Sequence, residues 1–329
     1  MSSSPRTAPV VRWDVAVVDG KRVEYMECGA GDPLVFLHGW GLTPRTYGAA
    51  ITGLTSAGVR LISPSLPGFG GSSALPLAAT TMADYAARVA GLLEIIGVDR
   101  PAFIIGHSFG GGVALRLATD RPDLVRSLTL INSVGGSPAP PTDAPPTGRF
   151  VAMTSRPWWQ WALALVAEAD PRYALQLRPT DLRRLVSGVV RDFVPNALRR
   201  PLPMVRSALL ALEADLAAEA QSLIDGGLPV LFVWGDRDRL ITPGAFSAIQ
   251  GEMPPEIVQG RHGWLLTSPE EFTALLRNAL VVHAMLERQR RGQAVSLPAG
   301  MSLADFIPDE RRHRSRSSSP ADRRTAPPA

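Results

Sequence analysis

The sequence of 329 residues contains a single cysteine, Cys28. One cysteine cannot form a disulfide within the chain, so the sequence makes no use of an oxidising compartment. The residues after Met1 are polar and lead into no apolar segment, which predicts that there is no secretory signal peptide. No stretch reaches the roughly eighteen uncharged apolar residues that a membrane span needs. The sequence therefore predicts a cytoplasmic protein.

An excess of charge of one sign is also absent from most of the chain. The net charge is +4, and six arginines against three carboxylates between Asp309 and Ala329 account for +3 of it. The remainder is close to neutral and lacks the electrostatic field of a nucleic-acid-binding protein, so no nucleic acid partner is expected. Lys21 is the only lysine, and the abundance of Arg, Ala, Pro and Gly indicates a GC-rich bacterial genome.

With 45% hydrophobic and 19% charged residues, the composition is that of an ordinary globular protein. Short apolar segments alternate with helical patterns along most of it. A hairpin is predicted around Asp19-Gly20, and the expected strands that follow are 34–37, 60–63, 102–105, 125–131, 229–234 and 256–258. The expected helices are 46–54, 82–96, a short one from Pro243 and a last one over 269–290. This alternation predicts an α/β fold, with a mostly parallel sheet covered by helices on both faces.

The alternation is interrupted after Val134. Residues 135–146 are rich in Pro, Gly and Ser, and the patterns that follow are helical, including a long amphipathic helix over 204–220. We therefore divide the chain into a flexible N-terminus (1–11), an α/β core (12–134 and 226–291), a helical insertion (135–225) and a C-terminal extension (292–329). The extension is rich in Arg, Ser and Pro and is expected to be largely disordered from about residue 311.

The most informative stretch is the motif G-x-S-x-G at Gly106 to Gly110, with Ser108 at its centre. A wholly apolar segment precedes it and a helical pattern follows it. A strand that turns directly into a helix crowds the residues on either side of the turn, which explains the glycines, and it places the serine in a strained backbone conformation. On the motif alone, a serine that simply caps the helix is the alternative.

This strand–turn–helix unit resembles the nucleophile elbow of the α/β-hydrolase family, and the resemblance extends over about residues 12–290. It implies the α/β-hydrolase fold, with the insertion 135–225 in the place of the family's helical lid, and a Ser–Asp–His order of catalytic residues. Ser108 is then the nucleophile, which is similar to the esterase and lipase branch. Haloalkane dehalogenases and epoxide hydrolases share the fold but use an aspartate.

The resemblance also selects the partners of Ser108. Of the five histidines, His262 lies in G-R-H-G-W after the predicted strand 256–258 and matches the family's histidine loop. The family pattern G-x-x-D selects Asp238 as the acid, whereas Asp236 is expected to accept backbone hydrogen bonds in the turn. The other histidines are expected in the elbow, before the oxyanion loop, in the last helix and in the tail: His107, His38, His283 and His313.

An oxyanion hole needs two backbone N–H groups aimed at the developing negative charge. By resemblance these belong to Phe109, which follows the nucleophile, and to Trp40, in the loop after the strand 34–37. The Trp40 ring can in addition line the substrate pocket. At Ser65 the sequence has serine where the family often has aspartate, at a position that is usually structural.

These expectations combine into a serine hydrolase that cleaves a carboxylic ester of a small to medium apolar substrate, without a metal or organic cofactor. The same triad also serves thioesterases, amidases, C–C bond hydrolases and cofactor-free perhydrolases, because a fold does not fix a function. A ligand-binding, receptor-like module with slow turnover is an alternative from another class. A third possibility is that the arginine-rich tail is an interaction segment, with solvated disorder as its alternative. The sequence indicates no oligomeric state.

Three tryptophans lie close together within the predicted insertion: Trp158, Trp159 and Trp161. On a helix, Trp158 and Trp161 share a face, while Trp159 points about 100° away. The hypothesis is that at least one of them lines the acyl site, since apolar pockets are commonly lined by aromatic side chains. The alternative is that all three form the core of the insertion.

Overall fold

The computed structural model describes residues 9–77, 80–136, 177–238, 240–241, 249 and 256–290. The chain divides into two compact units, residues 1–280 and 281–329. The packing reported below is that within the first, and His283, in the second, is described by its own burial alone. No helix in these described ranges is long and apolar enough to cross a membrane. The short helix predicted from Pro243 and the three clustered tryptophans, Trp158, Trp159 and Trp161, lie outside the described residues.

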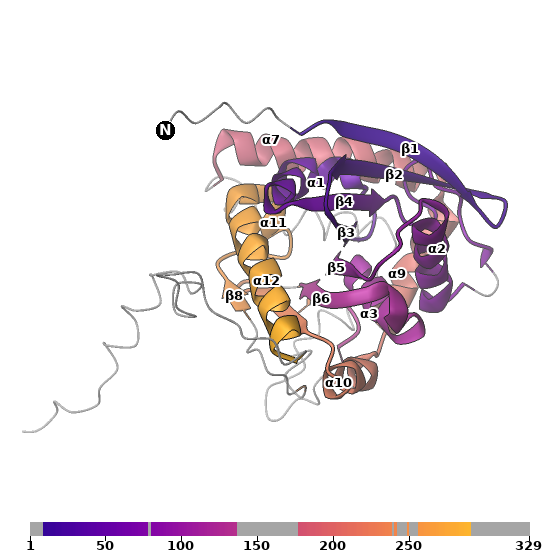
Figure 1. The fold of residues 1–329 in the computed structure, drawn as a ribbon. Helices are drawn as coiled ribbons and strands as arrows, with labels where there is room; N and C mark the ends of the chain where they lie inside the picture. The colour runs from indigo at the N-terminus through magenta and orange to yellow at the C-terminus, as the bar shows by residue number, and fades with distance from the viewer. Residues whose placement is uncertain are drawn as a thin grey trace, which may run out of the picture. The chain divides into compact units, whose positions relative to one another are not determined.

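A sheet of eight strands in the order β1-β2-β4-β3-β5-β6-β7-β8 forms the centre of this unit (Figure 1). Strand β2 pairs antiparallel with β1 and β4, and the neighbours from β4 to β8 pair in parallel. The strands are β1 (Val11–Val18), β2 (Lys21–Gly29), β3 (Asp32–Leu37), β4 (Val59–Pro64), β5 (Ala102–His107), β6 (Val125–Ile131), β7 (Val230–Gly235) and β8 (Glu256–Val258). The predicted α/β fold with a mostly parallel sheet is therefore confirmed.

Helices cover both faces of the sheet (Figure 1). One side carries α2 (Met82–Ile95) and α3 (Phe109–Asp120). The other carries α1 (Pro44–Ile51), the short α11 (Trp264–Thr267) and, from α12 (Pro269–Arg290), the residues up to 280 that belong to this unit. The 3-10 turns η1 (Thr52–Ala57) and η3 (Pro122–Leu124) lead into β4 and β6. On the α1 side, the ring of Phe36 lies 5.0 Å from Tyr47 and 6.3 Å from Phe272. These ring contacts join β3, α1 and α12 in one aromatic cluster.

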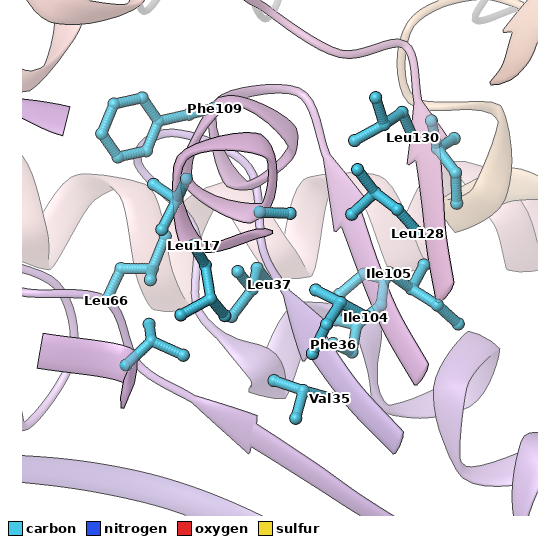
Figure 2. Packing of buried hydrophobic residues seen from close by; sticks show 14 of the residues in the cluster. Val35, Phe36, Leu37, Leu66, Ile104, Ile105, Phe109, Leu117, Leu128 and Leu130 are labelled. Carbon is cyan, nitrogen blue, oxygen red and sulfur yellow. The ribbon is translucent and has the colours of Figure 1, made fainter. Parts of the chain in front are cut away.

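The core is densest around the central strands, where side chains pack on both faces of the sheet (Figure 2). Every residue of β5 is buried, as are all residues of β3 and β6 apart from one partly exposed residue in each. Burying each large apolar side chain contributes roughly 1.5–3 kcal/mol. The continuous apolar stretches in the sequence therefore have a direct explanation, since strands in the middle of a two-sided α/β sandwich have no face toward water.

Between β6 and β7, most of the described residues from 179 to 225 are helical. This segment comprises α7 (Pro179–Gly188), the π-helical turn η4 (Val189–Phe193), α8 (Val194–Arg199), α9 (Pro201–Glu213) and α10 (Ala217–Asp225). The long helix predicted over 204–220 is wrong in one respect, because Ala214–Leu216 interrupt it. There the backbone N–H of Leu216 donates to Gly135 O at 2.7 Å, and Asp215 forms an isolated parallel β-bridge with Gly135. That residues 135–225 act as a lid remains a prediction.

Candidate active site

The carboxyl ends of five parallel strands meet at one edge of the sheet. The register pairs Leu37 with Gly106, Ile131 with both His107 and Val233, and Gly235 with Val258. In sheets of this kind, ligands bind beyond the carboxyl ends of the strands. The residues that follow these five ends are Trp40 after β3, Ser108 after β5, Asn132 after β6, Asp238 after β7 and His262 after β8.

The turn at Ser108 has the strained geometry that the motif predicts. Its backbone angles are φ 54° and ψ −119°, in the region that residues other than glycine rarely adopt. A Cβ on Gly106 would lie 2.5 Å from the carbonyl oxygen of Gly110, and a Cβ on Gly110 would lie 2.3 Å from the carbonyl oxygen of Leu37. Both approaches are shorter than any van der Waals contact. The two glycines are therefore required where β5 turns into α3.

The Ser108 hydroxyl lies 2.8 Å from Nε2 of His262, and Nδ1 of the same ring lies 2.9 Å from Oδ2 of Asp238. The side chain of Ser108 makes no capping hydrogen bond to α3, although Ser108 occupies the cap position. The alternative of a simple helix cap therefore does not describe this serine. The three residues that the sequence selected, far apart in the chain, form one continuous chain of hydrogen bonds.

The carboxylate of Asp238 is fully buried and is surrounded by donors. Its Oδ1 accepts the backbone N–H groups of Leu240 and Ile241, at 2.8 and 3.0 Å, while its Oδ2 accepts Asn132 Nδ2 and His262 Nδ1. Burial by itself raises the pKa of this carboxyl, but attraction to His262 and the hydrogen bonds outweigh burial and lower the pKa below its usual value. Asp238 is therefore an anion held in one orientation.

Asp236 has a different environment from Asp238. Its Oδ1 accepts the backbone N–H of Gly260 at 2.8 Å, and its side chain is 40% exposed. This contact ties the turn after β7 to the loop that carries His262. Asp236 thus accepts a backbone hydrogen bond, as expected, but from the loop after β8 and not from its own turn.

Asn132 is the residue of this site that sequence reasoning missed. Its amide Nδ2 donates to Asp238 Oδ2, and its Oδ1 accepts the indole N–H of Trp264 at 3.0 Å. It is fully buried and has φ 46°, a left-handed conformation that asparagine tolerates better than most residues. The signal available in the sequence was the polar residue that immediately follows the strand ending at Ile131.

The two proposed oxyanion donors adjoin the elbow. Phe109 is the first residue of α3, so its N–H has no acceptor within the helix. In the part of the chain that the structure describes, neither this N–H nor that of Trp40 donates to another protein group. The indole N–H of Trp40 donates to Met204 O and Ser207 Oγ, both at 3.0 Å, which joins this loop to α9. Its ring meets that of Phe193 edge to face at 5.4 Å.

The remaining described histidines lie outside the Ser108–His262–Asp238 chain. His38 and His107 are buried beside it, and His283 lies in α12. Among the described residues, no group of three or more His, Cys, Asp or Glu side chains is arranged to hold a metal ion. The groups that the described residues place at this edge of the sheet are a hydroxyl, an imidazole, a carboxylate and backbone amides.

Comparison with known proteins agrees with this architecture. A family model described as the alpha/beta hydrolase family matches residues 34–275. A putative non-heme haloperoxidase of Mycobacterium phage D29 is 27% identical over 270 residues, which cover 81% of this chain and 94% of that protein. A pimeloyl-acyl-carrier-protein methyl ester esterase of Aromatoleum aromaticum is 31% identical over 267 residues, or 75% of this chain and 97% of that protein. The crystal structure of a putative lipase of Acinetobacter baumannii aligns with a TM-score of 0.65 at 20% identity, covering 83% of this chain and 92% of that one. This chain belongs to the α/β-hydrolase family.

Proposed function

We propose that the protein is a serine hydrolase that cleaves a carboxylic ester of a small to medium apolar substrate. The observation that carries this proposal is the hydrogen-bonded chain from Ser108 Oγ through His262 to Asp238, with distances of 2.8 and 2.9 Å. The similarity to a methyl ester esterase supports the choice of bond. The aromatic pair Trp40–Phe193 beside the elbow, with ring centroids 5.4 Å apart, supports an apolar substrate.

The direction of proton transfer follows from the acceptors. An ionised carboxylate can only accept, so Asp238 holds the proton of His262 on Nδ1 and leaves Nε2 free to accept. As the Ser108 oxygen attacks the carbonyl carbon of the substrate, its proton passes to Nε2. The imidazolium that forms is stabilised by the buried carboxylate.

Collapse of the tetrahedral intermediate completes the first half of the reaction. The negative oxygen is held by the amides of Phe109 and Trp40, and His262 returns its proton to the leaving alcohol. Water then repeats the same sequence on the acyl-enzyme, which releases the acid and restores Ser108. No step requires a group other than those of the chain, the ester and water.

The test of this mechanism is the pair of variants Ser108→Ala and His262→Ala. Each is expected to lower kcat by roughly 10³-fold or more, because the three residues act as a unit. Ser63→Ala is a matched control, since Ser63 is also buried but bonds to Phe36 O on the neighbouring strand β3. It should retain activity. A fluorophosphonate should label Ser108 and no other serine, whereas a Ser108→Ala protein with a tenth of the original activity would overturn the mechanism.

Substrate class is tested with p-nitrophenyl esters of graded chain length, an acyl thioester and a vinylogous diketone. Preferred turnover of one of the esters supports the proposal. Faster cleavage of the thioester or of the diketone would replace it with thioesterase or C–C hydrolase activity on the same residues. Stoichiometric labelling of Ser108 together with negligible turnover of every compound would instead favour a slow, receptor-like module.

A further inference from the structure

We propose that Tyr47 and His107 are positioning residues for the reaction, because together they form a buried bridge between the loop that carries Trp40 and the loop that carries His262. This inference rests on the proposed function for its kinetic consequences. The bridge itself is a set of hydrogen bonds among well-buried groups. Neither residue belongs to the Ser108–His262–Asp238 chain.

The bridge has three hydrogen bonds in series. The backbone N–H of Gly39 donates to Tyr47 Oη at 3.1 Å. Tyr47 Oη lies 2.9 Å from His107 Nδ1, and His107 Nε2 lies 3.0 Å from the backbone carbonyl oxygen of His262. Tyr47 is fully buried, and His107 is 3% exposed. The bridge therefore connects α1, the end of β5 and the loop after β8.

The chemistry of the end groups fixes the position of every proton in the bridge. A carbonyl oxygen only accepts, so Nε2 of His107 carries the hydrogen and Nδ1 is the acceptor. Tyr47 accepts from Gly39 and consequently donates to Nδ1. Burial raises the pKa of Tyr47, which keeps its proton. Burial, followed by repulsion from His262, lowers the pKa of His107 to about 3, so the ring stays neutral and keeps this tautomer.

One end of the bridge holds the N–H of Gly39, the residue whose carbonyl belongs to the peptide that presents the N–H of Trp40. The Gly39 carbonyl accepts from His38 Nδ1 at 2.9 Å and from the N–H of Leu42 at 3.3 Å. His38 can donate there because its Nε2 accepts the N–H of Leu66. In a trans peptide the C=O and the next N–H point in opposite directions, so fixing the carbonyl of Gly39 fixes the direction of the Trp40 N–H.

Glycine is the residue whose flanking peptides rotate most easily. The bond from Gly39 N–H to Tyr47 holds the other side of this residue and opposes such a rotation. A Cβ on Gly39 would lie 2.9 Å from His107 Nδ1 and 3.0 Å from Tyr47 Oη, so a glycine allows the bridge to approach this closely. The oxyanion loop is thereby held at both the N–H and the C=O of Gly39.

The other end of the bridge holds the backbone of His262, the proposed general base. His107 immediately precedes Ser108, and its ring lies 5.1 Å from the ring of His262. Its bond to the His262 carbonyl fixes the backbone of the base relative to the nucleophile. Because a displacement of about 1 Å can cost roughly 10²-fold in rate, a contact to the backbone of the base has kinetic consequences without touching substrate.

Tyr47→Phe removes only the hydroxyl, and we expect it to lower kcat by about 10- to 10²-fold with KM unchanged within about twofold. His107→Ala should have a similar effect. His107→Gln should restore most of the rate, because a side-chain amide offers one acceptor and one donor, as the neutral imidazole does. The matched control is Tyr25→Phe, since Tyr25 is a buried tyrosine on β2 outside the bridge, and its kcat should be unchanged.

A second readout does not depend on turnover. In ¹⁵N-histidine NMR spectra, Asp238 should keep His262 in the Nδ1–H tautomer in every variant, and the ring resonances of His262 should be sharp in the wild type, in His107→Gln and in Tyr25→Phe. They should broaden in Tyr47→Phe and His107→Ala, because the backbone of His262 loses its anchor and the ring takes more than one position. If kcat and the line widths of His262 are both unchanged in these two variants while only Tm falls, the bridge is packing alone and the inference is overturned.

The two proposals fail separately. If the wild-type protein cleaves none of the esters and Ser108 is not labelled by a fluorophosphonate, the proposed function fails. In that case the NMR comparison of the wild type with Tyr47→Phe still decides whether the bridge positions His262. If turnover is present and the double variant Tyr47→Phe/His107→Ala loses the product of the two single effects, the residues act independently and the bridge is overturned. A loss no larger than that of one single variant supports it.

Discussion

The oxygens of Asp238 show how much of this site depends on single atoms. Each oxygen accepts two hydrogen bonds, and the donors include backbone and side-chain groups. An asparagine at this position has one acceptor oxygen and one amide donor. The backbone donors of Leu240 and Ile241 would attract the oxygen, which leaves the amide group to face Asn132 and His262.

We expect Asp238→Asn to lower kcat by about 10²- to 10⁴-fold while the fold stays intact. An amide that donates to His262 Nδ1 forces the ring proton onto Nε2. Nε2 can then no longer accept the proton of Ser108. The measurement is kcat together with circular dichroism and Tm.

The control for this prediction is Asp236→Asn. Its remaining oxygen still accepts the N–H of Gly260, so the free energy of unfolding should fall by about 1 kcal/mol or less, with kcat nearly unchanged. If Asp236→Asn abolished activity and Asp238→Asn did not, the assignment of the acid would be reversed.

On the scale of elements, the helical segment after β6 is joined to the loop after β3 by polar contacts. The buried carboxylate of Asp192, in the π-helical turn η4, accepts the hydroxyls of Thr43 and Thr46. Asn196, in α8, donates to Gly41 O at 3.0 Å and accepts the N–H of Gly70 at 3.0 Å. π-helical turns commonly occur at functional sites, and here the turn places a buried acid against the start of α1.

Removing this contact should therefore destabilise the protein. We expect Asp192→Ala to lower the free energy of unfolding by about 2–3 kcal/mol, because the buried hydroxyl of Thr43 and the half-buried hydroxyl of Thr46 lose their carboxylate acceptor. Asp192→Asn, which retains one oxygen, should cost less. Urea unfolding monitored by tryptophan fluorescence measures both.

Asp123→Ala is the matched comparison for Asp192→Ala. Asp123 pairs with Arg121 at 2.7 Å, but its side chain is 61% exposed, and exposed ion pairs contribute little. No measurable change is expected. Equal stability of Asp192→Ala and the wild type would show that η4 is not anchored through this carboxylate.

On the scale of the whole molecule, buried histidines predict sensitivity to acid. Burial lowers the pKa of His38 to about 4, that of His107 to about 3 and that of His283 to about 4. In an unfolded chain the pKa of histidine is about 6.5. Below that pH the unfolded chain binds protons that the folded protein does not, so the stability contributed by these neutral rings is present above pH 6.5 and is lost as the pH falls.

We expect the free energy of unfolding to decrease between pH 6.5 and pH 4, by up to about 3 kcal/mol for each histidine. His283→Leu should reduce the slope of the unfolding free energy against pH by the contribution of about one bound proton. Both ring nitrogens of His283 are buried without a hydrogen-bond partner among the described residues, so the substitution removes no hydrogen bond there. Denaturant unfolding at pH 7, 6, 5 and 4 measures both curves. A free energy that is flat over this range in the wild type would contradict the prediction.

The sequence by itself determined the strands and the elbow. The predicted strand over 125–131 has the same bounds as β6, and the helix predicted over 82–96 differs from α2 by one residue. Patterns of this kind are local, since the burial period of a strand or helix is written in neighbouring residues. The steric need for glycine at Gly106 and Gly110 is local for the same reason.

Only the tertiary structure decided which groups touch. Where the helix predicted over 204–220 is divided, Leu216 donates to Gly135, a residue distant in the sequence. The different surroundings of Asp236 and Asp238, the contacts of Asn132 and the bridge through Tyr47 and His107 likewise join residues from separate elements. Hydrogen bonds are directional and short, so partners far apart in the sequence meet only when sheet register and helix packing bring them together.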